Sequence, residues 1–371
     1  MNFFPFRLNS TASWAAVLFC FATTTVAHAQ GAPQNAARPP AAPFTALSVL
    51  PRFVASDVPR TGPGEVPVDP PTWHSRRPME QAPRPGRGAA EHPMLYIGEG
   101  CNTMFVVRDG KVIWSYATGQ GGEFDDIWML SNGNIIFSRM SYAEEVTPRK
   151  QVVWHLAAPA GTEIHSLQPV GLDQVLLIEN GLPPKILLLD KRTGETVVAH
   201  DLPAPSTTDR GTVHAQFRRV RLTGNGTYLV PYLEMGRVVE YDREFHEIWS
   251  YKIPTPWAAI RLQNGNTLIT DESEALTREV NPRGETVWEF KLSALPAEFH
   301  FTGSQSCVRL GNGHTILCSR GNGGEGCQLV EITPDQQVVS AMYDWKTFGP
   351  ATAIQALDDP GRPETPGDLQ R

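Results

Sequence analysis

The stretch RLQNGNTLIT, residues 261–270, decides the fold because versions of it recur along the chain. An apolar residue leads into Asn264-Gly265, and a β-rich run follows. Asn-Gly between two such runs favours a β-hairpin with a two-residue type I′ turn, in which both turn residues have positive φ. The other copies are MLSNGNIIFS (129–138), RLTGNGTYLV (221–230), RLGNGHTILC (309–318) and the degenerate PVGLDQVLLI (169–178). Five hairpins at similar spacing predict a repeat architecture.

A second motif, a strand, a turn and a strand that usually ends on a bulky residue, occurs six times. Asp, Asn or Thr-Pro turn residues separate its alternating runs. The copies are VVRDGKVIWSY (106–116), EVTPRKQVVWHL (145–156), LLDKRTGETVVAH (188–200), EYDREFHEIWSY (240–251), EVNPRGETVWEF (279–290) and EITPDQQVVSAM (331–342). Four strands in each repeat of this length are typical of a β-propeller blade, whereas a β-sandwich would not repeat its own sequence and solenoid repeats are shorter.

The two ends of the repeat region are complementary. The first repeat begins at MLYIGEG without an inner strand, and ATAIQAL (351–357) resembles the inner strands WAAIRL and QSCVRL. We therefore predict an all-β fold, a six-bladed β-propeller of four-stranded blades over residues 94–357. The C-terminal strand completes blade 1 and closes the ring, which removes exposed edges. The tail, residues 358–371, is expected to lie outside the ring.

The N-terminal segment predicts export. Arg7, a short apolar run and Ala27-His28-Ala29 fit a secretory signal peptide over residues 1–29, cleaved after Ala29. The alternative is an N-terminal membrane anchor, although the run is short for a bilayer. We expect a periplasmic or extracellular protein without a transmembrane segment after cleavage.

Residues 30–93 contain fourteen of the 32 prolines and few large apolar residues, which predicts a mostly disordered spacer. Within it, the apolar piece 44–54 is a candidate for docking on the propeller.

Charge and cysteines restrict the possible partners. Signal cleavage removes Arg7 and no acid, which takes the net charge from −7 to −8. An acidic chain without a basic run argues against nucleic acid, and we expect a monomer. No cysteine spacing suits a metal cluster. A two-residue turn at Asn312-Gly313 would place Cys307 opposite Cys318, so a disulfide between them is open.

The hairpin pattern Asn-Gly-Asn-x-ϕ-ϕ (ϕ is apolar), followed by Gly-x-x-ϕ-Trp, is similar to the blades of the pyrroloquinoline-quinone-like (PQQ-like, quinoprotein) propellers. The resemblance covers residues 94–357. It is closest to secreted, uncharacterised six-bladed members and more remote to bacterial arylsulfate sulfotransferases. Quinoprotein dehydrogenases typically have eight blades and longer chains, and several carry adjacent cysteines, which this chain lacks. We therefore expect no PQQ and predict no cofactor, with a divalent metal as an open alternative.

The sulfotransferase resemblance implies a channel histidine as sulfate acceptor. His165 in EIHSLQP and His214 in VHAQFRRVRL precede or begin inner strands, and Arg218 follows His214 by four residues. An imidazole there could attack sulfur while a guanidinium holds the sulfonyl oxygens. These three residues are the predicted catalytic set. The alternative is that the histidines only hydrogen-bond the neighbouring blade.

Ligands of propellers usually bind where the loops before the inner strand and after the second strand converge. The polar and aromatic residues there suit a polar ligand with an apolar face, such as a sugar. The predicted ligand-binding residues are Gln168, Gln216, Arg139, Tyr142, Glu179, Tyr232, Glu234, Trp257, Asp271 and Arg320.

Three functions stay open: a propeller that binds a small polar ligand or glycan, a glycan-active lyase or hydrolase, and a histidine-dependent sulfotransferase. A metal shared by His165, His214 and Gln168 would favour the lyase. Arg218 and Arg139 directed at His214 would favour sulfuryl transfer, and a plugged channel would favour binding alone.

Overall fold

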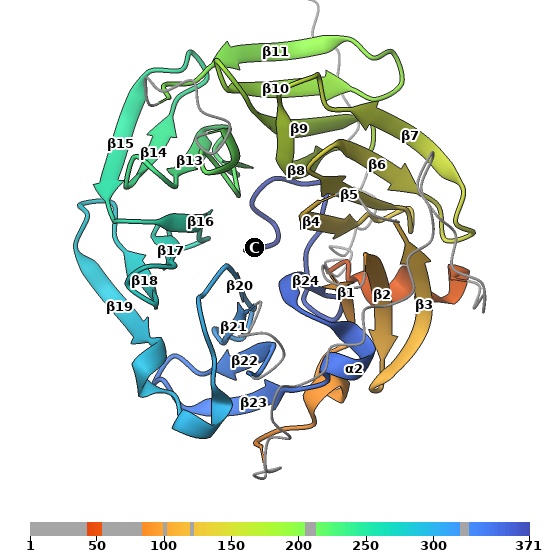
Figure 1. Ribbon diagram of the computed structural model, residues 1–371, viewed down its shortest axis with the longest axis vertical. Coiled ribbons are helices and arrows are strands. Elements are labelled where there is room, and N and C mark those ends of the chain that lie inside the picture. The colour runs from red at the N-terminus through yellow and green to blue at the C-terminus, as the bar shows by residue number, and fades with distance from the viewer. Residues whose placement is uncertain (1–42, 54–83, 99–101, 119–121, 205–212, 320–325) are drawn as a thin grey trace, which may run out of the picture. The chain divides into compact units, whose positions relative to one another are not determined.

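Six antiparallel sheets of four strands form a ring in the computed structural model, as predicted (Figure 1). The structure describes residues 43–53, 84–98, 102–118, 122–204, 213–319 and 326–371. The predicted signal peptide and Arg320 lie outside the described residues. No described helix is both long and apolar enough to cross a membrane.

Each blade runs from an inner strand at the channel to an outer strand at the rim of the ring. Blade 1 consists of β24 (Ala351–Ala356), β1 (Met94–Gly98), β2 (Thr103–Arg108) and β3 (Lys111–Ala117). Blade 2 consists of β4 (Phe124–Met129), β5 (Ile135–Arg139), β6 (Tyr142–Val146) and β7 (Val152–Ala157). Blade 3 consists of β8 (Glu163–Val170), β9 (Gln174–Asn180), β10 (Lys185–Asp190) and β11 (Thr196–Asp201).

The other three blades follow the same order. Blade 4 consists of β12 (Arg221–Leu222), β13 (Tyr228–Tyr232), β14 (Arg237–Tyr241) and β15 (Glu247–Lys252). Blade 5 consists of β16 (Pro256–Arg261), β17 (Thr267–Asp271), β18 (Leu276–Val280) and β19 (Thr286–Lys291). Blade 6 consists of β20 (Ser306–Arg309), β21 (Thr315–Cys318), β22 (Leu329–Ile332) and β23 (Val338–Met342).

The ring closes where the sequence predicts it. β24 pairs with β1 in antiparallel register, with Met94 opposite Ala356. Blade 1 thus combines strands from both ends of the repeat region. The short helix α2 (Trp345–Phe348) precedes β24. The 3₁₀ turns are η1 (Ala46–Arg52), η2 (Gly88–Ala90), η4 (Leu292–Ala294) and η5 (Ala297–Phe299).

The Asn-Gly hairpins have a different turn from the predicted one. In residues 261–270 the Gly265 N–H donates to the Leu262 carbonyl, and the Leu262 N–H donates to the Asn266 carbonyl, both at 2.9 Å. Gly265 has φ of 87°, whereas Asn264 keeps a negative φ. The prediction of a two-residue type I′ turn is wrong: the loop has three residues, a tight turn followed by a left-handed glycine. Asn264 instead stabilises the turn through its Oδ1, which accepts the Asn266 N–H at 2.9 Å.

This extra turn residue also separates the cysteines of blade 6. Cys307 lies opposite Leu317, and Cys318 lies opposite Ser306. A shift of one residue moves a side chain to the other face of a sheet. Cys307 and Cys318 accordingly belong to different hydrophobic clusters, and both are free thiols. The disulfide that the sequence left open is therefore absent between Cys307 and Cys318.

Neighbouring blades are joined by a recurring contact of Glu, Arg and Trp. Between blades 5 and 6, Arg309 Nη1 lies 2.9 Å from Glu279 Oε2, and its guanidinium lies 5.3 Å from the Trp288 ring centroid. The same contact recurs between blades 4 and 5 with Arg261, Glu240 and Trp249. The repeated Glu and Trp of the second sequence motif thus serve to join blades.

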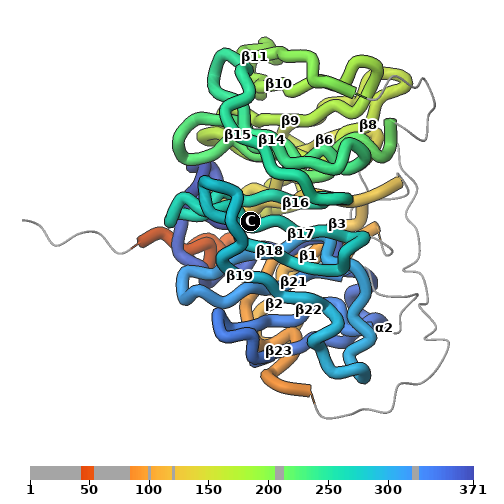
Figure 2. The backbone as a smooth tube through the Cα atoms, turned by 90° about the vertical axis from the view of Figure 1, so that its left-hand side faces the viewer, coloured from red at the N-terminus to blue at the C-terminus, as the bar shows by residue number. Residues whose placement is uncertain are grey.

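The two faces of the ring differ. We call the face that carries the Asn-Gly turns the turn face, and the face from which the chain enters the inner strands the mouth face. Figure 2 shows η1 and the C-terminal tail on the side opposite α2. The docked apolar piece contributes Val49 and Leu50 to the core of blades 1 and 2.

The tail does not lie outside the ring, in contrast to our expectation. It runs over the turn face, where the Gly311 N–H donates to Asp359 Oδ1 at 2.8 Å and the Gln263 N–H donates to Gln370 Oε1 at 2.9 Å. The chain then enters the channel, and Figure 1 places the C-terminal end at the centre of the ring. Arg371 is buried there, so the tail plugs the channel from the turn face.

Candidate functional site

Inner strands of the propeller carry β-bulges at equivalent positions on the mouth face. In blades 2, 3 and 5 the register shifts by one residue there, which leaves Asp125, His165 and Trp257 as the extra residues. Arg218 lies at the corresponding point ahead of β12 in blade 4. Bulges re-aim side chains and are common beside active sites. Four different side chains therefore occupy one ring of equivalent positions.

His165 lies between two carboxylates. Its Nδ1 is 2.6 Å from Asp125 Oδ2, and its Nε2 is 2.7 Å from Glu163 Oε2. The imidazole is fully buried. Asp125 thereby fixes the orientation of the ring, as the carboxylate partners of metal-binding histidines do.

His214 occupies the solvent side of the same cluster. Its Nδ1 lies 2.9 Å from Glu163 Oε2, and its Nε2 lies 3.3 Å from Glu123 Oε1. The side chain is 37 % exposed. The rings of His165 and His214 meet edge to face, with centroids 5.2 Å apart. Solvent therefore reaches the cluster through His214.

Arg218 closes the other side of the cluster. Its Nη2 is 3.0 Å from His214 Nε2, and its Nε is 3.5 Å from Glu123 Oε2. The guanidinium lies 4.9 Å from the ring centroid of Trp257. Because Arg218 can only donate, it bonds His214 Nε2 when that nitrogen is unprotonated, whereas Glu123 bonds the same nitrogen when it carries a proton.

These contacts change the pKa values of the cluster. Hydrogen bonds to Glu123 and Glu163 raise the pKa of His214 to about 9. Burial alone lowers the pKa of His165, but Asp125 and Glu163 outweigh burial and raise it. Burial likewise raises the pKa values of Glu123 and Glu163, but the adjacent imidazoles outweigh it and lower both to about 2. At neutral pH His214 therefore holds a proton between two ionised carboxylates.

The cluster has the composition of a metal site. One ligand atom from each of Glu123, His165 and His214 lies within 4.8 Å of the others. Two imidazoles and a carboxylate suit Zn²⁺ and neighbouring first-row metals, whose bonds to such ligands are about 2.0–2.2 Å long. A divalent cation binds imidazoles in their neutral form and would therefore displace the proton of His214.

The predicted catalytic residues thus come together, but several predicted ligand-binding residues are engaged in structure. Gln168 bonds the main chain of Leu222 in the next blade at 2.7 and 3.1 Å. Gln216 bonds both main-chain groups of Gly181 at 2.9 Å. Both glutamines join blades, so a metal shared by Gln168 and the histidines is not what the structure shows.

Arg139 and Tyr142 bond the main chain near Glu123. Arg139 donates to the carbonyls of Gly122 at 2.9 Å and Glu123 at 3.2 Å, and is fully buried. The Tyr142 hydroxyl donates to the Thr118 carbonyl at 3.3 Å. Arg139 is directed at the main chain and not at His214, in contrast to the arrangement expected for sulfuryl transfer.

The remaining predicted ligand residues lie apart from the cluster or are buried. Tyr232 is buried and bonds the Tyr241 hydroxyl at 2.8 Å. Asp271 accepts the Thr255 N–H at 2.7 Å and caps a loop of blade 5. Burial raises the pKa of the half-buried Glu179, and Glu234 is exposed in a turn. With Trp257 also buried under Arg218, these residues offer no exposed aromatic face for a sugar.

Sequence reasoning missed two acids of the cluster, Glu123 and Glu163. Each stands two residues before the bulge residue of its blade, in Glu123-x-Asp125 and Glu163-x-His165. Side chains at i and i+2 share a face of a strand. Alignment of these two repeats would have placed all four side chains at the mouth.

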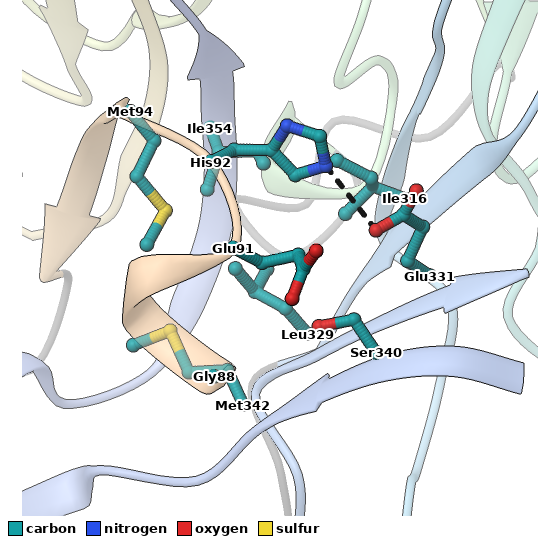
Figure 3. Close-up of a pocket in the computed structure, with 10 residues that line it drawn as sticks. All are labelled: Gly88, Glu91, His92, Met94, Ile316, Leu329, Glu331, Ser340, Met342 and Ile354. Carbon is teal, nitrogen blue, oxygen red and sulfur yellow. Dashed lines mark hydrogen bonds and ion pairs between the residues drawn. The ribbon is translucent and has the colours of Figure 1, made fainter. Parts of the chain in front are cut away.

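A small pocket lies elsewhere, between blade 6 and the segment ahead of β1 (Figure 3). Its volume of about 20 Å³ has room for little more than one water molecule. Figure 3 shows His92 and Glu331 directed toward each other at its edge, 3.2 Å apart. It is too small for a substrate, so the chemistry of the histidine cluster makes that cluster the better candidate.

Comparisons with known proteins show the fold and no family. No family model and no curated protein sequence matches the chain. A protein of unknown function from Bacteroides caccae is 25 % identical, with a TM-score of 0.64, and the match covers 72 % of this chain and 98 % of that one. A streptogramin B lyase structure matches with a TM-score of 0.50 at 11 % identity, over 71 % of this chain and 85 % of that one. Similarity to PQQ-like proteins or arylsulfate sulfotransferases is not shown by these matches.

Proposed function

We propose that the protein is an exported β-propeller that binds a polar ligand at the mouth face through a divalent cation held by Glu123, His165 and His214. The observation that carries the proposal is the convergence of these ligand atoms within 4.8 Å. Three consecutive blades supply them, and the exposed side of His214 leaves an approach from solvent. A metal site with an open position binds substrate or water, whereas purely structural sites are closed.

The ligand class follows from the same chemistry. The mouth offers charged and hydrogen-bonding groups, while its aromatic residues are buried. A hydroxyl-rich or carboxylate-bearing ligand, such as a uronic oligosaccharide, would bind the cation through oxygen and Arg218 through its carboxylate. Carbohydrate remains the favoured ligand class. The cation and Arg218 would recognise its oxygen atoms, and no aromatic side chain would stack on the sugar ring.

The geometry argues against sulfuryl transfer. His214 is hydrogen-bonded by two carboxylates that raise its pKa to about 9. A protonated imidazole lacks the lone pair needed to attack sulfur.

Titration calorimetry of the chelator-treated full chain with Zn²⁺, Mn²⁺ and Mg²⁺ tests the proposal. We expect one saturable cation per chain in the wild type and its loss in Glu123→Gln and His214→Ala. His246→Ala is the matched control, because His246 is an exposed turn histidine paired with Asp242. A uronic oligosaccharide should then bind only the metal-loaded protein. Absence of saturable cation binding, or equal binding in all variants, would refute the proposal.

Glu163 supports a second candidate, a glycan lyase or hydrolase. Its Oε2 contacts both imidazoles, at 2.7 and 2.9 Å, without belonging to the three-residue ligand set. Once a cation displaces the proton of His214, this carboxylate is placed to accept a proton as a general base. Glu163→Gln should then retain cation and oligosaccharide binding but lose product formation, measured by chromatography. If neither the wild type nor the variant forms product, the lyase or hydrolase candidate is excluded and ligand binding is the remaining function.

A further inference from the structure

A second cluster of charges fills the channel between the mouth and the tail. Asp126 on β4 accepts two hydrogen bonds from Arg221, at 2.8 and 3.2 Å, and one from Arg219 Nη1 at 3.2 Å. Arg371 Nη2 approaches the same carboxylate at 3.7 Å. All four side chains are at least 94 % buried. We call these four residues the channel cluster.

The channel cluster has more cations than anions. Asp126 is the one acidic side chain that forms ion pairs with these three arginines among the described residues. Three guanidiniums therefore face one carboxylate in a region shielded from water. A free main-chain carboxylate at residue 371 would add one negative charge and still leave the cluster positive. Buried charge without a counterion is strongly unfavourable.

Unused donors accompany the excess charge. Within the described part of the chain, Arg371 Nη1, Arg371 Nη2 and Arg219 Nε have no hydrogen-bond partner. Arg371 Nε is satisfied by the Ile354 carbonyl at 3.2 Å. The Arg371 guanidinium lies 4.0 Å from the centroid of the Trp128 ring. This ring balances part of the guanidinium charge but accepts no hydrogen bond from the terminal nitrogens. The two terminal nitrogens of Arg371 thus form a fork of donors without a hydrogen-bond acceptor among the described residues.

We propose that the channel cluster binds a small oxyanion, held by the paired terminal nitrogens of Arg371 together with Arg219. A guanidinium presents parallel N–H groups that match two oxygens of a phosphate, sulfate or carboxylate. The anion supplies the missing negative charge and the missing acceptors in one group. It also ties the C-terminal tail to blade 4, because its ligands come from Arg371 and from the segment ahead of β12.

The proposed anion site is distinct from the cation site. Asp126 faces the arginines in the channel, while Asp125 faces His165 at the mouth. The bulge residue Asp125 and the next residue, Asp126, therefore belong to two different clusters. The anion proposal stands whether or not the mouth binds a metal.

Thermal unfolding of the full chain tests this site. Phosphate, sulfate or chloride is titrated at constant ionic strength with gluconate, which is bulky, as the balancing anion. A ligand that binds only the folded state raises the midpoint progressively with its concentration. We expect phosphate or sulfate to raise the midpoint of the wild type, and Arg371→Gln to weaken the apparent affinity at least tenfold. Arg362→Gln is the control, since Arg362 belongs to the same tail but is 55 % exposed.

Each outcome decides the proposal. Equal responses of wild type and Arg371→Gln, or no response beyond that to gluconate, would overturn it. A response to chloride alone would overturn the oxyanion class. If Arg371→Gln does not fold, crystals of the wild type grown with selenate give the answer: anomalous density beside the Arg371 fork supports the site, and its absence refutes it.

Discussion

The contacts between blades repeat the same residue types around the ring, whereas the side chains at the mouth differ from blade to blade. Blades 4 and 5 and blades 5 and 6 are joined by the same residue types in the same geometry, with both guanidinium-to-tryptophan distances at 5.3 Å. At the mouth, equivalent bulge positions carry Asp125, His165, Arg218 and Trp257. Repetition therefore identifies the residues that build the ring, and divergence at equivalent positions identifies candidates for function.

The largest expected effect is at Asp126, which has no equivalent in the repeated contacts. Asp126→Asn removes the one carboxylate among three buried arginines, and loss of one partner in such a buried set costs about 3–5 kcal/mol. Urea denaturation measures the change in the free energy of unfolding. Asp173→Asn, at an exposed ion pair with Arg192, should change it by less than about 1 kcal/mol. A small effect of Asp126→Asn would mean that the cluster is not electrostatically critical.

A smaller effect is expected when the partner of a ligand is changed. Asp125→Asn keeps the shape beside His165 but weakens the orientation of its ring, which should lower cation affinity by about 10–100-fold. Titration calorimetry measures the cation affinity. Glu145→Gln, a buried glutamate bonded to Asn134 at 2.6 Å in the same blade, should leave cation affinity unchanged. Equal losses in both variants would indicate a general loss of structure.

The repeated contacts should be energetically interchangeable. Arg261→Ala and Arg309→Ala each remove one ion pair and one cation–π contact, for a cost of about 1–3 kcal/mol each. Because the two contacts are separate, the double variant should show the sum within about 0.5 kcal/mol. Denaturation of the three variants checks this, and strongly unequal costs would show that similar geometry conceals different roles.

The smallest predicted effect is on pH dependence near blade 1. Hydrogen bonds from Asp358 and Glu331 raise the pKa of His92 to about 10, above its ordinary value of 6.5. A pKa raised by folding stabilises the protein fully below pH 6.5, and this stabilisation is lost as pH rises toward 10. Solvent screens the ion pairs of His92, because this side chain is only partly buried, and the full pKa shift therefore does not appear in the free energy of unfolding. His92→Gln should reduce the difference in the free energy of unfolding between pH 6 and pH 9.5 by about 1 kcal/mol. Identical pH profiles would exclude His92 as a source.

The sequence predicted the ring well because blade spacing is encoded locally. Each turn needs a glycine that can take positive φ, and Gly265 and its counterparts mark those points at regular distances. The strand 351–356 was recognisable because its apolar pattern matches other inner strands. These signals depend on neighbouring residues only, so a single sequence contains them.

The site was harder to predict because it depends on register. One extra residue in the hairpin of blade 6 moved Cys307 and Cys318 to opposite faces, and one bulge residue per inner strand directs His165 to the mouth. Periodicity alone does not show a shift of one residue. Tyr232 and Trp257 were predicted to bind a ligand but are buried. The reason is related: a side chain at the end of a strand on the mouth face can still point into the core.

The pairing of β24 with β1 has a consequence for biosynthesis. Translation makes β1 some 250 residues before its partner strand, so the nascent ring stays open and blade 1 exposes an unpaired edge throughout synthesis. An unpaired edge is a template for aggregation. Premature termination ahead of residue 351 should therefore yield insoluble product, because β1 would lack its partner strand.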